Sequence, residues 1–160
     1  MTMKKKELIV TSALPYANGP LHFGHLLEHI QTDIWVRAQR LLGNVCIYLC
    51  ASDAHGTPVM MKAEEENVSP EKLVEKYMKE HKKTLEAFQV SHDCYYQTHS
   101  DENRQYSELI YNTALKNGYI SKKNIKQLFD EEKKLFLADR YVRGNCPKCN
   151  ANDQYGDNCC

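Results

Sequence analysis

The apolar residues of the first fifty positions change their spacing twice. Residues 7–13, "ELIVTSA", form a short run of β-favouring residues that ends at Pro15, which predicts a strand. Residues 44–51, "NVCIYLCA", are apolar at both alternating sets of positions, as in a strand covered on both faces. Between them, apolar residues at helical spacing predict a helix that stops at Gly43: Leu26, Leu27, Ile30, Ile34, Trp35, Ala38, Leu41 and Leu42.

A strand, a helix and a strand in this order form a right-handed crossover, so we predict an α/β fold with a parallel sheet. After the loop 51–58, Thr57 and Pro58 predict the start of one helix and Ser69 caps a longer one. Residues 94–100 predict a third strand, and a further helix runs to Gly118. Beyond Gly118 the pattern predicts two short strands joined across 130–133, so we place a domain boundary there, giving domains 1–118 and 119–160.

Composition narrows the class of protein but does not identify its function. The 160 residues suffice for about one domain, and 21 basic and 21 acidic residues give no electrostatic case for nucleic-acid binding. No apolar stretch is long enough for a membrane span or resembles a secretory signal, so we expect no membrane association and a cytoplasmic location. The oligomeric state cannot be read from the sequence.

Seven cysteines form two groups. Cys46, Cys50 and Cys94 lie in strand-like runs and are interpreted as small buried apolar residues. The other four crowd the last fifteen positions, where a cytosolic chain favours metal binding over disulfides: Cys146, Cys149, Cys159 and Cys160.

The loops 14–25 and 51–58 both leave the carboxyl ends of strands, where α/β sheets bind ligands, and we expect them to converge. In the first, Gly24 lets backbone approach a ligand, and His22 and His25 lie at a helix start that favours anions. Phosphate binding is the favoured role of the two histidines. Two alternatives stay open: a metal site, although the H-E-x-x-H pattern is absent, and a purely structural role such as a helix cap.

Four segments resemble one family. "ALPYANGPLHFGH" resembles the first signature of class I aminoacyl-tRNA synthetases, and its lead-in is similar to that of the methionine enzymes. "CASDAHGTP", "THSDENRQYSELIY" and "DRYVRGNCPKCNANDQYGDNC" resemble further segments of the same family, in its order. The resemblance is to the N-terminal portion of bacterial-type methionyl-tRNA synthetases. It implies the first half of a Rossmann-like parallel sheet with flanking helices, followed by the start of a zinc-knuckle insert.

The resemblance also implies a reaction: ATP, with Mg²⁺, activates methionine to methionyl-adenylate, and the methionyl group passes to tRNA(Met). His22 and His25 take the catalytic role of steadying the ATP phosphates. Phe23 replaces the usual Ile or Leu between them, at an apolar packing position. The implied ATP-binding residues are Tyr16, Asn18, Gly19, His22, Gly24 and His25. The implied methionine-binding residues are Leu14, Tyr16 and Asp53, for which packing and turn formation are the simpler alternatives.

In the cysteine-rich end, Cys146-x2-Cys149 is half of a tetrahedral zinc site. Cys159 is the third expected ligand. The family pattern continues Cys-x-x-Cys, whereas here Cys160 follows Cys159 directly, so Cys160 is the weaker candidate for the fourth. Water as the fourth ligand, an open site and free thiols on a tail remain alternatives.

The family's lysine-rich Lys-Met-Ser-Lys-Ser loop and its anticodon-binding domain do not occur in these 160 residues. We therefore expect a fragment or truncated product that does not aminoacylate tRNA alone and exposes apolar surface. Two other functions stay open. One is a non-catalytic remnant whose zinc knuckle binds RNA or protein, and the other is a class I enzyme for leucine, valine, isoleucine or cysteine.

Overall fold

The computed structural model describes residues 5–132, 134–137 and 142–155. Its contacts divide the chain into two compact units, Met1–Asn112 and Thr113–Cys160. The division falls inside a helix a few residues before the boundary predicted at 118, and the predicted domain limits stay a prediction. Each unit is described by itself below.

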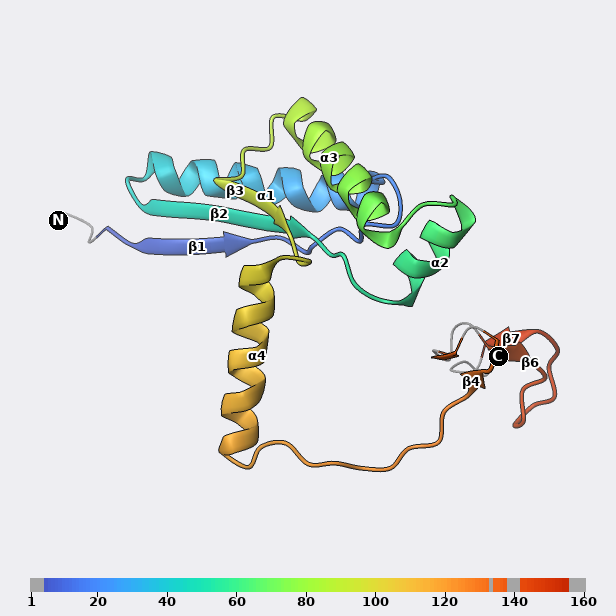
Figure 1. The fold of residues 1–160 in the computed structure, drawn as a ribbon. Helices are drawn as coiled ribbons and strands as arrows, with labels where there is room; N and C mark the ends of the chain where they lie inside the picture. The colour runs from blue at the N-terminus through green and yellow to red at the C-terminus, as the bar shows by residue number, and fades with distance from the viewer. Residues whose placement is uncertain (1–4, 133, 138–141, 156–160) are drawn as a thin grey trace. The chain divides into compact units, whose positions relative to one another are not determined.

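The first unit is an α/β layer built on a parallel sheet (Figure 1). The order of the sheet is β1-β2-β3, and both pairings are parallel, with Glu7 opposite Val45 and Leu49 opposite Cys94. This confirms the predicted parallel sheet with helical crossovers. The elements are β1 (Glu7–Thr11), α1 (Phe23–Leu41), β2 (Val45–Ser52), α2 (Thr57–Glu65), α3 (Pro70–Ala87), β3 (Cys94–Gln97) and α4 (Asp101–Lys116).

Both long crossover helices cover the same face of the sheet (Figure 1). On β2, Tyr48 forms a hydrogen bond with His29 of α1, and Ser52 forms one with His81 of α3. Both strand residues therefore point to the same face of the sheet. Their face is buried at alternate positions, whereas Val45 on the opposite face is 52% exposed. The prediction that β2 is covered on both faces is therefore wrong for this chain, because no described helix packs on the second face.

The helix ends form where the sequence predicts them. Gly43 ends α1 with a φ of +83°, a conformation that glycine adopts without steric cost. The hydroxyl of Ser69 accepts a hydrogen bond from the Lys72 N–H at 3.3 Å and caps α3, with Pro70 as its first residue. Gly56, with a φ of +110°, precedes Thr57 at the start of α2.

The buried stripe of α1 differs from the predicted apolar stripe. The helix buries Leu26, His29, Asp33 and Val36, while predicted members such as Leu41 are exposed. The difference arises because two polar side chains have partners inside the fold. Asp33 accepts hydrogen bonds from the Ser91 N–H and hydroxyl at 2.9 and 3.0 Å, and together with the Arg37 guanidinium these outweigh the effect of burial and lower the pKa of its carboxyl.

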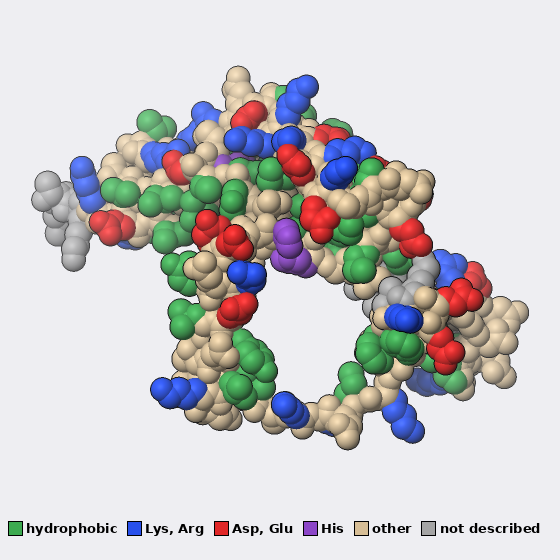
Figure 2. Space-filling view, viewed as in Figure 1, with side chains coloured by type: hydrophobic (Ala, Val, Ile, Leu, Met, Phe, Trp, Pro, Cys, Tyr) green, Lys and Arg blue, Asp and Glu red, His purple; other side chains and the backbone are tan. Residues whose placement is uncertain are grey.

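Two apolar clusters form the core of the first unit. One joins α2 and α3 to the loops after β1 and β2, and the other lies between α1, α3 and the sheet. Cys46 and Cys50 are buried as predicted, whereas Cys94 is exposed, so that part of the cysteine prediction is wrong. The exposed apolar side chains of β1 and β2 form part of the hydrophobic surface in Figure 2.

In the second unit two short hairpins follow an extended segment. β4 (Phe129–Asp130) pairs antiparallel with β5 (Leu135–Phe136), which confirms the hairpin predicted across 130–133. β6 (Arg143–Gly144) pairs antiparallel with β7 (Gln154–Tyr155), and the segment 146–149 lies in the loop that joins them. No helix among the described residues is long and apolar enough to cross a membrane.

Truncating a core side chain tests this packing. We expect Leu85→Ala, which removes a side chain only 1% exposed, to lower the free energy of unfolding by about 2–5 kcal/mol. Leu41→Ala on α1 is the matched control, since Leu41 is 89% exposed and its truncation leaves no cavity. Urea unfolding followed by circular dichroism measures both, and equal effects for the two variants would contradict the described core.

Candidate active site at the carboxyl edge of the sheet

The loop after β1 is joined to the end of β2 by backbone hydrogen bonds. The Ala17 N–H donates to the Asp53 carbonyl at 2.8 Å, and the Asp53 N–H donates to the Pro15 carbonyl at 2.8 Å. Tyr16 and Asp53 thus form an isolated parallel bridge beyond the last regular pair of β1 and β2. The convergence expected of these two loops is present in the structure.

Tyr16 crosses from the first loop to the second. Its hydroxyl donates a hydrogen bond to the His55 carbonyl, and its half-buried ring packs on the cluster beneath α2 and α3. A Cβ atom at Gly56 would lie 2.7 Å from the Tyr16 hydroxyl oxygen. Glycine is therefore required at position 56 both by its positive φ and by the approach of this ring.

Asp53 is half-buried at the end of β2 and is held by Thr98. The Thr98 hydroxyl donates to Asp53 Oδ1 at 3.3 Å and accepts a hydrogen bond from the Ala54 N–H at 2.8 Å. Thr98 is itself anchored, because its N–H donates to the Ser52 carbonyl at 3.0 Å. Among the described residues only Oδ1 of the carboxylate is engaged in this way, which leaves Oδ2 available to a cationic ligand group.

His22 and His25 form a capping box at the start of α1. The Gly24 N–H donates to His22 Nδ1 at 3.1 Å, and the His22 N–H donates to His25 Nδ1 at 3.3 Å. The two rings stack with centroids 3.7 Å apart. The helix-cap alternative is therefore part of the structure, and it does not exclude the phosphate role.

The capping box determines which nitrogen of each ring carries a hydrogen. Because Nδ1 of both rings accepts from a backbone N–H, each neutral imidazole keeps its hydrogen on Nε2 and can donate from there. Burial of His25, with smaller contributions from His22 and His81, lowers the pKa of its imidazole and favours this neutral donor form. The start of α1 thus carries two side-chain N–H donors at the positive end of the helix dipole.

The residues that flank the pair also contribute. A Cβ atom at Gly24 would lie 2.9 Å from Cε1 of His22, so the absence of a side chain makes room for the capping ring itself. Phe23 is 88% exposed, so the prediction of an apolar packing position is not met among the described contacts. No other His, Cys, Asp or Glu of the described chain joins His22 and His25 in a potential metal cluster, which leaves the metal alternative without a third ligand there.

The remaining predicted ligand residues lie on the same loop. Leu14 is 42% exposed, and Asn18 and Gly19 are half-buried. The Gly19 carbonyl accepts a hydrogen bond from His81 Nε2 of α3 at 2.7 Å. This contact fixes the loop midway between its two ends.

His81 and Thr98 are positioning residues that sequence reasoning missed. A carbonyl only accepts hydrogen bonds, so His81 donates from Nε2 and accepts at Nδ1 from the Ser52 hydroxyl, 3.1 Å away. Ser52 Oγ in turn lies 2.9 Å from the Tyr95 hydroxyl. The only sequence signal for His81 is a histidine on the apolar face of its helix, which is indistinguishable from a core residue without the fold.

A cavity of about 670 Å³ is lined in part by Thr98. It lies between the loop after β2 and the start of α4, and His55 and His99 meet at it with ring nitrogens 3.1 Å apart. None of the residues predicted to hold ATP or methionine lines it. Thr98, which bonds to Asp53, also lines this cavity.

The predicted zinc ligands are only partly within the described residues. Cys146 is buried and Cys149 is exposed, in a turn closed by hydrogen bonds from the Asn150 N–H to the Cys146 carbonyl and from the Cys146 N–H to the Ala151 carbonyl, both 2.9 Å. A tight turn of this kind suits two thiolates on one ion. Cys159 and Cys160 lie outside the described residues.

Comparison with known families identifies the class of protein. A family model described as tRNA synthetases class I (M) matches residues 8–160, which is nearly the whole chain. The chain belongs to the class I tRNA synthetases.

A solved structure shares the fold. A LeuRS of Agrobacterium radiobacter, in a ternary complex with tRNA and LeuAMS, superimposes with a TM-score of 0.75 and 19% sequence identity. The match covers 94% of this chain and 20% of that one, so the chain spans about one fifth of the LeuRS length. The similarity supports the α/β, Rossmann-like arrangement of the parallel sheet and its flanking helices.

The link between His81 and the loop predicts a pH dependence. Burial lowers the pKa of His81 below its ordinary value, opposed by the Gly19 carbonyl and Glu80. As the pH falls, His81 therefore takes up a proton more readily in the unfolded chain than in the folded chain. The contribution of His81 to the free energy of unfolding is present above about pH 6.5 and is lost below it. We expect His81→Gln to lessen the decrease in unfolding free energy between pH 7 and pH 5.

The control for this measurement is His55→Gln, an exposed histidine outside the Ser52–His81–Gly19 chain of bonds. The titratable groups near His81 include His25, His29, Tyr77 and Glu80, and all of them are kept in the two variants. An unchanged pH slope in His81→Gln, measured by urea unfolding, would show that His81 is not a source of the dependence.

Proposed function

We propose that the chain is the N-terminal part of the catalytic domain of a methionine–tRNA ligase, in which ATP, with Mg²⁺, activates methionine for transfer to tRNA(Met) in the cytoplasm. The observation that supports this best is the capping box, which leaves two Nε2–H donors at the start of α1, on the edge of the sheet where Asp53 follows β2. Membership in the class I tRNA synthetases supports the reaction class.

The donors act on the phosphates. A carboxylate oxygen of the amino acid attacks the α-phosphorus, the bond from phosphorus to the bridging oxygen breaks, and pyrophosphate leaves with that electron pair. Negative charge grows on the phosphate oxygens as the fifth bond forms, and fixed N–H donors stabilise it more than the ground state. The Nε2–H groups of His22 and His25 supply such donors at the positive end of the α1 dipole.

Asp53 and Tyr16 are proposed to bind the amino acid. The free Oδ2 of Asp53 suits the ammonium group, since a carboxylate forms a charge-assisted hydrogen bond with it. The Tyr16 ring, held by its bond to the His55 carbonyl, offers an aromatic wall for a thioether, and Leu14 offers backbone beside it. Asn18 and Gly19 complete the loop around the nucleotide.

The choice of methionine rests on sequence. The "ALPYANG" lead-in and the cysteine-rich end resemble the methionine enzymes, and the matching family model carries the letter M in its description. The proposed Zn²⁺ in the Cys146–Cys149 turn has a structural role, with Cys159 and, more weakly, Cys160 completing the ligands. The buried Cys146 in its closed turn fits such an ion.

Pyrophosphate exchange tests the catalytic assignment in the encoded protein at its full length, with the 160-residue chain assayed in parallel. We expect His25→Ala to lower methionine-dependent ATP–pyrophosphate exchange by about 10²–10³-fold, because it removes a transition-state donor. Lys79→Ala, at an exposed position of α3, is the control and should retain exchange. Exchange by His25→Ala at the control rate would remove His25 from the mechanism.

Substrate choice is tested separately with Asp53→Asn. Loss of the carboxylate charge should raise the KM for methionine by about 10–100-fold while leaving the KM for ATP nearly unchanged. The parent protein should exchange with methionine and not with leucine, valine, isoleucine or cysteine. Preference for one of these four would retain the enzyme class and refute methionine.

A further inference from the structure

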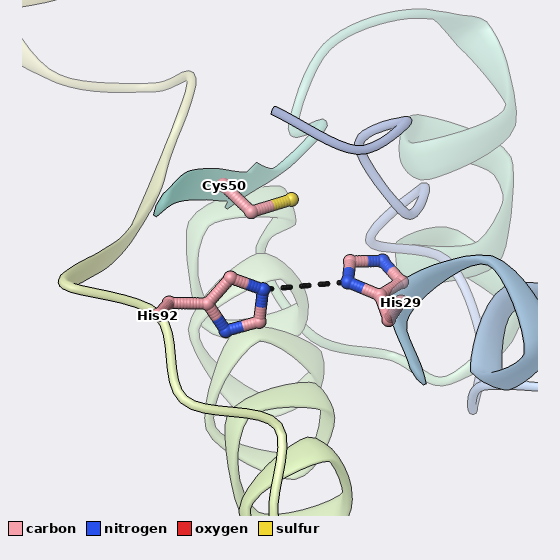
Figure 3. A group of neighbouring side chains, drawn as sticks. All are labelled: His29, Cys50 and His92. Atoms are coloured by element: carbon pink, nitrogen blue, oxygen red, sulfur yellow. Dashed lines mark hydrogen bonds between the residues drawn. The ribbon is translucent and has the colours of Figure 1, made fainter. Parts of the chain in front are cut away.

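A second group of potential metal ligands lies inside the first unit, away from the Cys146–Cys149 turn in sequence. His29 of α1, Cys50 of β2 and His92 just before β3 point towards one another, with one ligand atom of each within 4.8 Å of the others (Figure 3). His29 is 1% exposed and Cys50 7% exposed, and His92 is half-buried. Three separate elements of the sheet layer therefore meet at this cluster.

The spacing of the donors fits a small tetrahedral ion. Bonds of about 2.0 Å to nitrogen place two nitrogen ligands of Zn²⁺ about 3.3 Å apart. His29 Nδ1 and His92 Nε2 are 3.4 Å apart. The thiol sulfur lies within 4.8 Å of the other two ligand atoms. A tetrahedral ion with bonds of about 2.0 Å to nitrogen and about 2.3 Å to sulfur would bring it to about 3.5 Å from each nitrogen, a shift of at most about 1.3 Å. Ser12 Oγ lies 3.1 Å from His29 Nδ1 and 3.6 Å from Cys50 Sγ, so an oxygen atom also borders the cluster.

A hydrogen-bond network alone accounts poorly for His29. Its Nδ1 lies within 3.4 Å of Ser12 Oγ, Tyr48 Oη and His92 Nε2, although it offers only one hydrogen or one lone pair. Its Nε2 is the buried side-chain polar atom that has no hydrogen-bond partner among the described residues. The polar contacts of the ring are therefore all at Nδ1. A cation bound there would accept the Nδ1 lone pair, which can accept a hydrogen bond from only one of the three neighbouring groups.

The Ser52–His81–Tyr95 group provides an internal comparison. It repeats the arrangement of Ser12, His29 and Tyr48: a serine at the end of a strand, a histidine on the following helix and a tyrosine on the next strand. In the repeat both histidine nitrogens are satisfied, one by Ser52 and one by the Gly19 carbonyl. The first group differs because Cys50 and His92 also border the histidine, and a thiol and a second imidazole are ligand types that zinc binds.

The charge states of the three groups are compatible with a cation. Burial and the neighbouring His29 lower the pKa of His92 to about 4, and burial lowers the pKa of His29, so both rings present lone pairs at neutral pH. Burial raises the pKa of the Cys50 thiol. A divalent ion reverses that effect, since the thiol proton passes to solvent and the thiolate binds the metal.

We propose that His29, Cys50 and His92 bind a divalent ion of the zinc class at a structural site distinct from the knuckle. Two imidazoles and one thiolate select such borderline-soft ions over Mg²⁺ or Ca²⁺. The ion fastens α1 to β2 and to the segment before β3. Because His29 follows His25 by one helical turn, the site also secures the end of α1 that carries the phosphate-binding pair.

The test uses Co²⁺ as a spectroscopic probe in the 160-residue chain. All four C-terminal cysteines are first replaced by serine, giving the background Cys146→Ser, Cys149→Ser, Cys159→Ser and Cys160→Ser, so that the knuckle cannot bind. We expect this background to bind one equivalent of Co²⁺ with thiolate-to-cobalt absorption and the visible bands of a tetrahedral site. Loss of all bound cobalt in the background would overturn the proposal, whatever the knuckle does.

Substitutions in that background identify the ligands. Cys50→Ala should abolish the thiolate absorption, and His92→Phe should weaken cobalt binding at least tenfold. Cys46→Ala is the matched control, because Cys46 is a buried cysteine of the same strand outside the cluster. X-ray absorption of the zinc-loaded background gives a readout without any core substitution. One sulfur and two nitrogen neighbours support the site, and the absence of sulfur overturns it.

Discussion

The alignment of β1 with β2 is the constraint on which the candidate site depends. The strands are parallel and in register, and their pairing continues past the regular ladder as the bridge between Tyr16 and Asp53. Two backbone hydrogen bonds of 2.8 Å therefore fix where the loop leaves the sheet, and Tyr16 and Asp53 take their positions from them. A parallel pair places both carboxyl ends at one edge, so this constraint follows from topology before any side chain is considered.

Buried polar contacts extend this backbone constraint into the helices. Each strand–helix–strand step carries a serine, a histidine and a tyrosine joined by hydrogen bonds, first through His29 and then through His81. Such groups stabilise a fold only when their partners are in place, and they therefore select one arrangement of helix on sheet. In the second of these groups, His81 also donates a hydrogen bond to the Gly19 carbonyl and so links α3 to the loop after β1.

The sequence predicted those features that depend on local chemistry. Gly43, Ser69 and Pro70 mark helix ends by backbone rules that hold in any fold, and the β–α–β order implied the parallel sheet. The buried stripe of α1 was predicted wrongly, because the partners of His29 and Asp33 come from segments distant in sequence. The exposure of Val45 and Ile47 on the second face of β2 was likewise unpredictable, since covering that face depends on elements that a strand's own residues do not reveal.

The residues of the candidate site likewise fall into those that the sequence predicted and those that only the fold reveals. Resemblance and spacing indicated His22, His25, Tyr16 and Asp53, and the structure brings the two loops that carry them together. Thr98 and His81, which hold Asp53 and Gly19, gave no usable signal, because a hydroxyl or an imidazole acquires its role only when the fold supplies an acceptor. The roles of these residues in binding ATP and methionine remain proposals that rest on chemistry and family.

His22 has two tasks in one ring. Its Nδ1 accepts the Gly24 N–H that starts α1, and its Nε2 is the atom left for a ligand. A phosphate group held at Nε2 would fix the ring and so reinforce the first turn of the helix. Conversely, fraying of that turn would release the ring and weaken the hold on the phosphate. In the proposed phosphate complex, ligand affinity and helix stability at this point would therefore be coupled thermodynamically through His22.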